Sequence, residues 1–154
     1  MKSIIFFYSY HHNNTLKICN TIGSKLNSII INIDKDNEIK KIDNYDLIGF
    51  GAGIDSGKHY PKFIEYVEKL PEVQNKKAFI FSTSAISSNK KMLKDHKFLK
   101  NILENKGFKI VGEFSCKGYN TNSFLKYIGG MNKGHPNNID IKNAEEFAEK
   151  LIEI

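Results

Sequence analysis

The chain has 154 residues, a length that suits one domain with its own core, so we expect residues 1–154 to form a single domain. It has no apolar run of the ~18 residues that a membrane span needs and no signal-peptide core, which predicts a cytoplasmic protein. The net charge is +6 but every basic residue is lysine, and without the forked contacts of arginine we expect no nucleic-acid partner.

Buried strands and amphipathic helices alternate in the first part of the chain. The continuous apolar run Ser3–Tyr8 is typical of a parallel strand that is buried on both faces. Apolar residues recur at helical spacing in residues 15–26, which predicts a helix. A second strand is expected at 28–33, and a third at 45–53, where the chain runs into several glycines.

The second half of the chain continues this alternation. We expect a helix, a strand, a helix, a strand and a helix in turn, at residues 61–70, 76–84, 92–106, 108–116 and 138–154. Pro61 suits the first turn of its helix, and Gly107 is a natural stop for the helix before it.

Five strands that alternate with helices predict an α/β fold with three layers, α-β-α, around a parallel sheet. The strand order 2-1-3-4-5 is the leading candidate for a doubly wound sheet of this length. In such sheets ligands bind at the carboxyl ends of the strands, where the winding reverses, which here lies between the first and third strands.

Three polar stretches fall at this carboxyl edge. They are "SYHHNNT" after the first strand, "GAGIDSGKHY" after the third and "STSAISS" after the fourth. A phosphate at the start of the first helix would meet free backbone N–H groups and the positive end of the helix dipole. The first stretch has no lysine, so it predicts a neutral cradle, which suits a phosphate monoester held by hydrogen bonds.

The first stretch resembles the phosphate-binding loop of flavodoxins, T-x-T-G-N-T, which also lies between the first strand and the first helix. Asn14 and Thr15 match its terminal Asn-Thr, Asn13 matches the glycine and His12 the threonine before it. Ser9 matches the first hydroxyl, with one extra residue in between.

That extra residue leaves open which of Ser9, Tyr10 and His11 contacts the phosphate. The same resemblance covers nearly the whole chain, and it implies FMN as the cofactor.

In flavodoxins the isoalloxazine ring of FMN lies between the loops after the third and fourth strands. The resemblance therefore implies ring contacts from two segments of this chain, namely Ala52, Gly53, Ile54 and Asp55, and Ser82, Thr83, Ser84 and Ala85. A glycine near flavin N5, as Gly53 is expected to be, lets its peptide turn over. Tyr60 and Tyr119 are the candidates for stacking on the ring.

The sequence lacks the residues that a metal site, a serine hydrolase or a tyrosine phosphatase would need. Adjacent His11 and His12 point to opposite sides of an extended turn and have no partner ligands nearby, so we expect no metal. Hydrolysis by Ser82 or Ser84 lacks the G-x-S-x-G pattern and a histidine placed by the sequence to serve them. Without arginine, a tyrosine phosphatase with this sheet order is excluded. We therefore expect no catalytic residues.

The sequence also gives expectations for the two cysteines and for two of the histidines. The cysteines Cys19 and Cys116 are expected to be free, half-buried thiols, because two cysteines are too few for a disulfide framework or a zinc site. His59 and His135 are expected in solvated loops, with His59 also a candidate for the flavin edge.

These features together predict an FMN-binding, flavodoxin-like protein that acts in electron transfer. Two alternatives stay open: an FMN-dependent NAD(P)H:quinone-type oxidoreductase, and a binding module with this fold but no cofactor. Flavodoxins are usually acidic, whereas the pI here is about 9.2, which implies either a redox partner protein with an acidic docking surface or a protein that is not a free carrier. We expect a monomer or a weak dimer.

Overall fold

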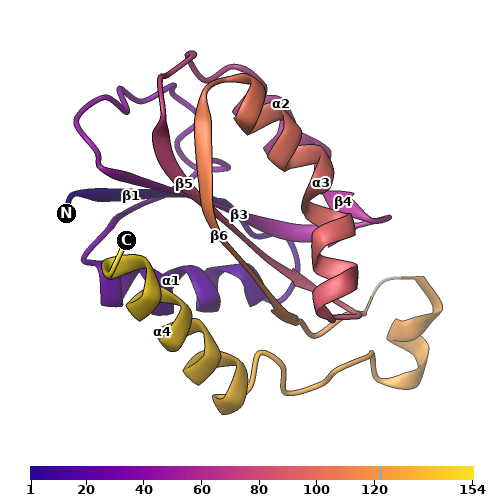
Figure 1. Cartoon of the computed structure of the whole chain (residues 1–154). Helices are drawn as coiled ribbons and strands as arrows, with labels where there is room; N and C mark the ends of the chain where they lie inside the picture. The colour runs from indigo at the N-terminus through magenta and orange to yellow at the C-terminus, as the bar shows by residue number, and fades with distance from the viewer. Residues whose placement is uncertain (122) are drawn as a thin grey trace.

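The computed structural model describes residues 1–121 and 123–154 (Figure 1). Its elements in chain order are β1 (Ser3–Tyr8), α1 (Asn14–Leu26), β2 (Ile29–Asn32), β3 (Leu47–Asp55), β4 (Lys58–His59), α2 (Pro61–Glu68), β5 (Lys76–Ser84), α3 (Asn89–Asn105), β6 (Phe108–Lys117), η1 (Ser123–Ile128) and α4 (Asn138–Ile152). None of the helices in these ranges is both long and apolar enough to cross a bilayer.

Five strands form a parallel sheet in the order β2-β1-β3-β5-β6. Since β5 and β6 are the fourth and fifth strands predicted from the sequence, the predicted order 2-1-3-4-5 is confirmed. The short strand β4 was not predicted. It pairs antiparallel with the end of β3, and its two residues are too few to give a periodic pattern.

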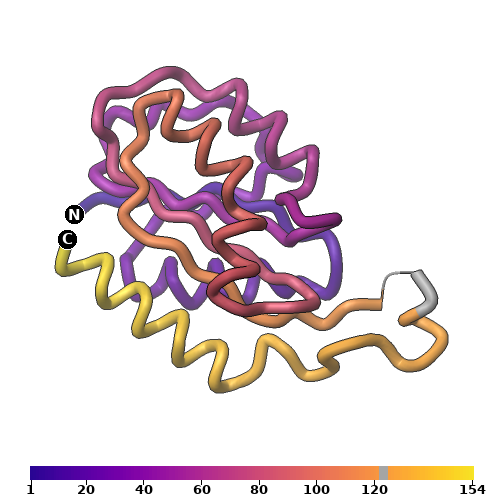
Figure 2. Tube along the Cα trace, turned by 45° about the vertical axis from the view of Figure 1, so that its right-hand side comes forward, coloured from indigo at the N-terminus to yellow at the C-terminus, as the bar shows by residue number. Residues whose placement is uncertain are grey.

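Helices cover both faces of this sheet. Figures 1 and 2 show α1 and α4 side by side on one face, and α2 and α3 on the other. Side chains of β1 alternate between the two cores: Phe6 packs among the residues under α2 and α3, and Phe7 among those under α1 and α4. Both rings are almost fully buried, which explains the continuous apolar run of this strand.

The glycines of β3 make room for aromatic rings of the neighbouring strand. A Cβ atom on Gly49 would lie 2.4 Å from Cζ of Phe79, and one on Gly51 would lie 2.0 Å from Cζ of Phe81. These distances are far below van der Waals contact, so the sheet packs β5 against β3 only because both positions lack a side chain. The glycine pattern is thus part of the core.

The end of β3 differs from the sequence prediction. The predicted third strand ended at Gly53 and placed 52–55 in a loop, whereas β3 continues to Asp55, because Ile54 and Asp55 pair with His59 and Lys58. The turn between β3 and β4 has positive φ at both Ser56 (52°) and Gly57 (79°), the geometry of a two-residue type I′ hairpin.

The prediction of a solvated His59 is wrong. This residue lies in β4 and is 2% exposed, with its ring beside those of Phe63 and His96. His135 is partly buried and its Nδ1 lies 2.6 Å from a carboxylate oxygen of Asp140. The two cysteines are free thiols, as predicted, but they are buried rather than half-buried.

Candidate functional site

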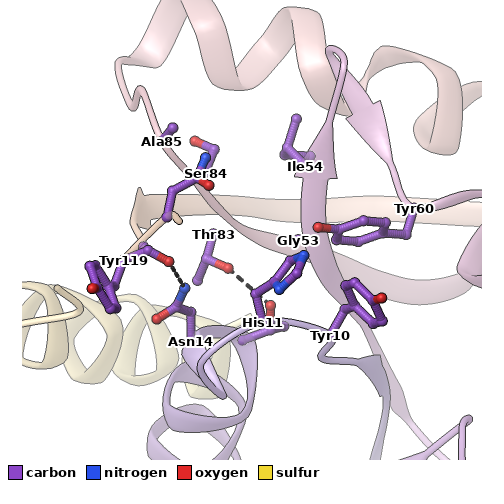
Figure 3. A pocket seen from close by; sticks show the side chains of 13 residues that line it. Tyr10, His11, Asn14, Gly53, Ile54, Tyr60, Thr83, Ser84, Ala85 and Tyr119 are labelled. Carbon is purple, nitrogen blue, oxygen red and sulfur yellow. Dashed lines mark hydrogen bonds between the residues drawn. The ribbon is translucent and has the colours of Figure 1, made fainter. Parts of the chain in front are cut away.

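A pocket opens at the carboxyl edge of the sheet, between the ends of β1, β3, β5 and β6 (Figure 3). Its empty space, including the solvent at its open mouth, is about 390 Å³. The residues that line it are Tyr10, His11, Asn14, Thr15, Gly53, Ile54, Tyr60, Thr83, Ser84, Ala85, Gly118, Tyr119 and Asn120.

One end of the pocket is the start of α1. The turn before this helix has left-handed backbone at His12 (φ 52°) and Asn13 (φ 54°), a conformation that asparagine tolerates better than most residues. Asn13 occupies the N-cap position, yet its side chain makes no capping hydrogen bond, and the first turn contains no acidic residue. The N–H groups of this turn therefore lack the side-chain acceptor that usually satisfies them, and the positive end of the dipole faces the pocket.

Two buried polar atoms beside this turn have no hydrogen-bond partner among the described residues. They are Oγ of Ser9 and Oδ1 of Asn14. A buried polar atom without a partner costs about 1–3 kcal/mol, so native structures rarely leave one unless a ligand or water satisfies it. A hydroxyl can donate to an anion, and an amide oxygen can accept from a ligand hydroxyl.

Hydrogen bonds hold the first loop against the ends of β5 and β6. Oγ1 of Thr15 lies 2.9 Å from Oγ1 of Thr83, and Nδ2 of Asn14 donates to the carbonyl of Tyr119 at 2.8 Å (Figure 3). Nε2 of His12 lies 2.8 Å from Oγ1 of Thr121, outside the pocket. The cradle is thus fixed from two sides before any ligand enters.

Aromatic rings form the other end of the pocket. The ring of Tyr60 lies 5.9 Å from that of Tyr10, which in turn lies 4.2 Å from the ring of His11. Gly53 allows this approach, because a Cβ at that position would lie 2.8 Å from Cε2 of Tyr60. Figure 3 shows Tyr10 and Tyr60 on the side of the pocket away from Tyr119.

The sequence prediction for Gly53 is a peptide that can turn over beside the ligand. In the structure its carbonyl accepts a hydrogen bond from the backbone N–H of Tyr60 at 3.3 Å.

The lining of the pocket is electrically neutral. It includes no lysine, aspartate or glutamate, and histidine is its only titratable group apart from the tyrosines. Burial, together with the neighbouring His12, lowers the pKa of His11, so this imidazole is uncharged at neutral pH. Anion binding here would depend on N–H and hydroxyl donors, as the sequence predicted.

The structure brings together eight of the fourteen residues predicted for the site. Those that line the pocket are His11, Asn14, Thr15, Gly53, Ile54, Thr83, Ser84 and Ala85. The other six lie outside the lining, for separate reasons. Ser9 lies just behind it, His12 and Asn13 are exposed on the outer side of the turn, and Asp55 is exposed in the β3–β4 hairpin.

Ala52 and Ser82 are fully buried, because strand alternation directs their side chains to the face of the sheet under α2 and α3.

Five lining residues were not among those fourteen. Tyr10 was an open alternative for the phosphate, and Tyr60 and Tyr119 were candidates for ring stacking. Gly118 and Asn120 were missed altogether. They follow β6, whose carboxyl end lies at the same edge as the other three loops, and this topological signal was available in the sequence.

Ser82 belongs to a buried polar network under the pocket. Its Oγ lies 2.8 Å from Nε2 of His96, whose Nδ1 lies 3.1 Å from Oε2 of Glu113. The hydrogen bond with His96 is the main cause that lowers the pKa of Glu113. The sequence placed no histidine near Ser82, and the structure corrects that expectation.

The network nevertheless does not provide a hydrolytic site. Ser82 and His96 are both 0% exposed, so a substrate cannot reach the hydroxyl. No group of three or more potential metal ligands occurs within residues 1–121 and 123–154 either. The pocket therefore suits a bound organic group with an anionic end near α1 and a flat, apolar end among the aromatic rings.

Comparison with known proteins agrees with this geometry. A family model described as "Flavodoxin domain" matches residues 5–135. A protein of Methanocaldococcus jannaschii that is described as uncharacterized is 50% identical over 152 residues, which cover 99% of each chain.

Solved structures of low sequence identity share the fold. Oxidised Flavodoxin 1 from Bacillus cereus aligns with a TM-score of 0.73 at 16% identity, covering 98% of this chain and 97% of its own. A Fusobacterium nucleatum flavodoxin bound to flavin mononucleotide aligns with a TM-score of 0.67 at 16% identity, covering 99% of this chain and 98% of its own.

Proposed function

Because this chain belongs to the flavodoxin family, we propose that it binds FMN in the pocket at the carboxyl edge of the sheet and transfers electrons between proteins. The observation that carries the proposal is the uncapped start of α1 together with the partnerless Oγ of Ser9 and Oδ1 of Asn14. Oγ of Ser9 and Oδ1 of Asn14 have no partner among the described residues, and α1 has no side-chain cap, so this end of the pocket offers a neutral set of donors and an acceptor to a ligand.

The residues present fit the parts of FMN. The N–H groups at the start of α1 and the hydroxyl of Ser9 would hold the phosphate, in a cradle without countercharge. Oδ1 of Asn14 would accept a hydrogen bond from a ribityl hydroxyl. The ring would lie between Gly53 and Ile54 on one side and Thr83, Ser84 and Ala85 on the other.

Bound FMN would supply the redox chemistry, and the protein would bind, orient and shield it. Thr15 and Thr83 fix the distance between the first loop and the end of β5, because their hydroxyls are hydrogen-bonded within a buried contact. The hydrogen bond between Gly53 and Tyr60 fixes the far wall. Such a preformed site binds its ligand without first having to order its own loops.

The exposure of the pocket supports a role as an electron carrier. Tyr10 at the rim is 65% exposed, so the site lies at the surface, where a partner protein could approach it.

The absorption spectrum of the purified protein tests the cofactor. We expect flavin bands in the visible range, and release of free FMN, identified by chromatography, when the protein is denatured. A colourless protein that stays colourless after incubation with excess FMN would overturn the proposal.

Steady-state kinetics separate the two functional classes. For a carrier, the FMN-loaded protein should oxidise NADH or NADPH with a quinone acceptor no faster than free FMN at the same concentration. Saturable turnover well above that background would show that the protein is an oxidoreductase.

A further inference from the structure

A lysine-lined groove lies between the β3–β4 hairpin and α3. It holds about 970 Å³ of empty space, and the side chains that matter for its chemistry are Lys58, Lys91, Lys94, Asp95, Lys97 and Phe98. None of them belongs to the pocket described above.

Most of the positive charge in this groove is not neutralised within the described chain. Lys91 is paired with the buried Asp95, with an Nζ–Oδ2 distance of 2.5 Å. Lys58, Lys94 and Lys97 form no ion pair with any described residue. The groove therefore presents four lysines against one carboxylate.

An apolar surface lies among these charges. Phe98 is 43% exposed, and Nζ of Lys58 lies 4.9 Å from the centre of its ring. Exposed apolar side chains surrounded by charged ones are typical of a surface that another protein covers.

The groove shares two chain segments with the pocket. The β3–β4 hairpin continues directly from Gly53 and Ile54, and α3 begins at Asn89, shortly after Ala85. Figure 3 shows Ile54 at the upper edge of the pocket, toward the hairpin and the helix. A protein seated in the groove would thus lie beside the pocket, within reach for electron transfer.

We propose that this groove is the docking surface for an acidic electron-transfer protein, so that carboxylates of the partner face Lys58, Lys94 and Lys97. The inference rests on the proposed electron-transfer function. Complementary charge raises association rates and fixes orientation, and free lysines are suited to this role because they are solvated and adaptable. In each encounter the reduced partner would lose one electron and the bound FMN would gain it.

A charge-reversal experiment tests the docking surface. The triple variant K58E/K94E/K97E is compared with K69E/K109E/K150E, which makes the same charge change at exposed lysines near the opposite, amino-terminal edge of the sheet. Both FMN-loaded proteins are mixed in a stopped-flow instrument with a prereduced small acidic ferredoxin at low ionic strength, where charges act over about 30 Å.

We expect the groove variant to lose at least about tenfold in the second-order rate constant and most of its salt dependence, and the control variant to lose less than about threefold. Equal losses in both variants would show an effect of net charge alone and overturn the proposal, as would no loss in either. Tighter binding of polyuridylate than of the ferredoxin by the groove would also overturn it.

FMN binding is measured first in each variant, by titration of the apoprotein. Because none of the six lysines lines the pocket, their affinities should equal that of the wild type. Failure of the wild type to bind FMN would count against the proposed function, whereas normal FMN binding with unchanged electron-transfer rates would count against the docking surface alone.

Discussion

Ser9 directly follows β1, and its hydroxyl is shielded from water and has no partner among the described residues. If this hydroxyl serves FMN, its removal should have opposite effects on the free and the loaded protein. In Ser9→Ala we expect the FMN dissociation constant to rise by about tenfold, because a hydrogen bond to a charged group is lost. The apoprotein should be as stable as the wild type or more stable, because a buried unsatisfied atom is removed.

Ser88→Ala is the matched control for this prediction. Ser88 caps α3 by accepting a hydrogen bond from the N–H of Lys91, so its loss should destabilise the apoprotein by about 1 kcal/mol without changing FMN affinity. FMN titration and urea unfolding measure both effects. A Ser9→Ala apoprotein that is markedly less stable and binds FMN normally would contradict the assignment.

His59 gives a prediction about pH. Burial, with a further contribution from His96, lowers its pKa well below 6.5, so it stays neutral in the folded protein while it can protonate in the unfolded chain. Its contribution to stability is complete above the unfolded pKa and is lost as the pH falls toward the folded pKa. We expect the free energy of unfolding to fall by up to about 1.4 kcal/mol per pH unit between about pH 6.5 and 5.

His59→Phe should remove this part of the pH dependence, since phenylalanine fits the ring environment of Phe63 and His96 and does not titrate. Urea unfolding at several pH values compares the two proteins. The lowered pKa of Glu113 adds its own acid sensitivity only below its ordinary value of 4.5, outside this range. Parallel stability curves for the two proteins would show that His59 is not a buried neutral group.

Sequence reasoning placed individual site residues correctly where the pattern of neighbouring residues was enough to position them. Asn14 and Thr15 could be placed because they start a helix after a buried strand, and that position alone directs them to the sheet edge. Ser82 was misplaced by one step of strand alternation, which turned it into the core toward His96. That contact joins residues from β5 and α3, and local sequence does not contain it.

Among the elements, the segment between β6 and α4 holds the walls of the pocket together. Asn132 has left-handed backbone (φ 59°), and its Nδ2 donates to the carbonyl of Ala85 at 2.6 Å. The backbones of Asn120 and Met131 exchange two hydrogen bonds in the same segment. The side chain of Asn132 thus connects this segment to the loop after β5.

Asn132→Gly should loosen that segment. Glycine keeps the left-handed backbone accessible, so the variant removes the side-chain contact without adding strain. We expect the amides of Asn120 and Met131 to exchange with deuterium about tenfold faster. Asn27→Gly, at another left-handed position that ends α1, is the control and should leave these amides unchanged. Equal exchange in Asn132→Gly and the wild type would show that the contact to Ala85 does not hold the segment.

A helix or strand could be predicted where its packing produces an apolar pattern in its own sequence. Long buried strands and amphipathic helices were predicted because their apolar periodicity spans many residues, and the sheet order followed from their alternation. Residues 52–55 were placed in a loop by the resemblance to flavodoxins, but β3 continues to Asp55 because Ile54 and Asp55 pair with β4. The glycines of β3 are required by Phe79 and Phe81 of β5, a long-range fit that no local rule expresses.

For the whole molecule, the neutral pocket and the distribution of positive charge support the same function. The pocket is neutral and the net charge is +6, with free lysines gathered in the groove beside the pocket. A chain of this kind would hold its cofactor by hydrogen bonds and use its charge to attract partners. The net charge was evident from the sequence, whereas its concentration next to the pocket depends on the β3–β4 hairpin, which was not predicted.

The central claim is that the start of α1 and Ser9 hold the phosphate of FMN while the opposite walls hold its ring. Equilibrium titration of the apoprotein with FMN and with riboflavin, which lacks the phosphate, tests it most directly. We predict one FMN bound per chain, and binding of riboflavin weaker by about 100-fold, the equivalent of about 2.7 kcal/mol in phosphate contacts. Equal affinity for the two compounds, or no binding of either, would contradict the account.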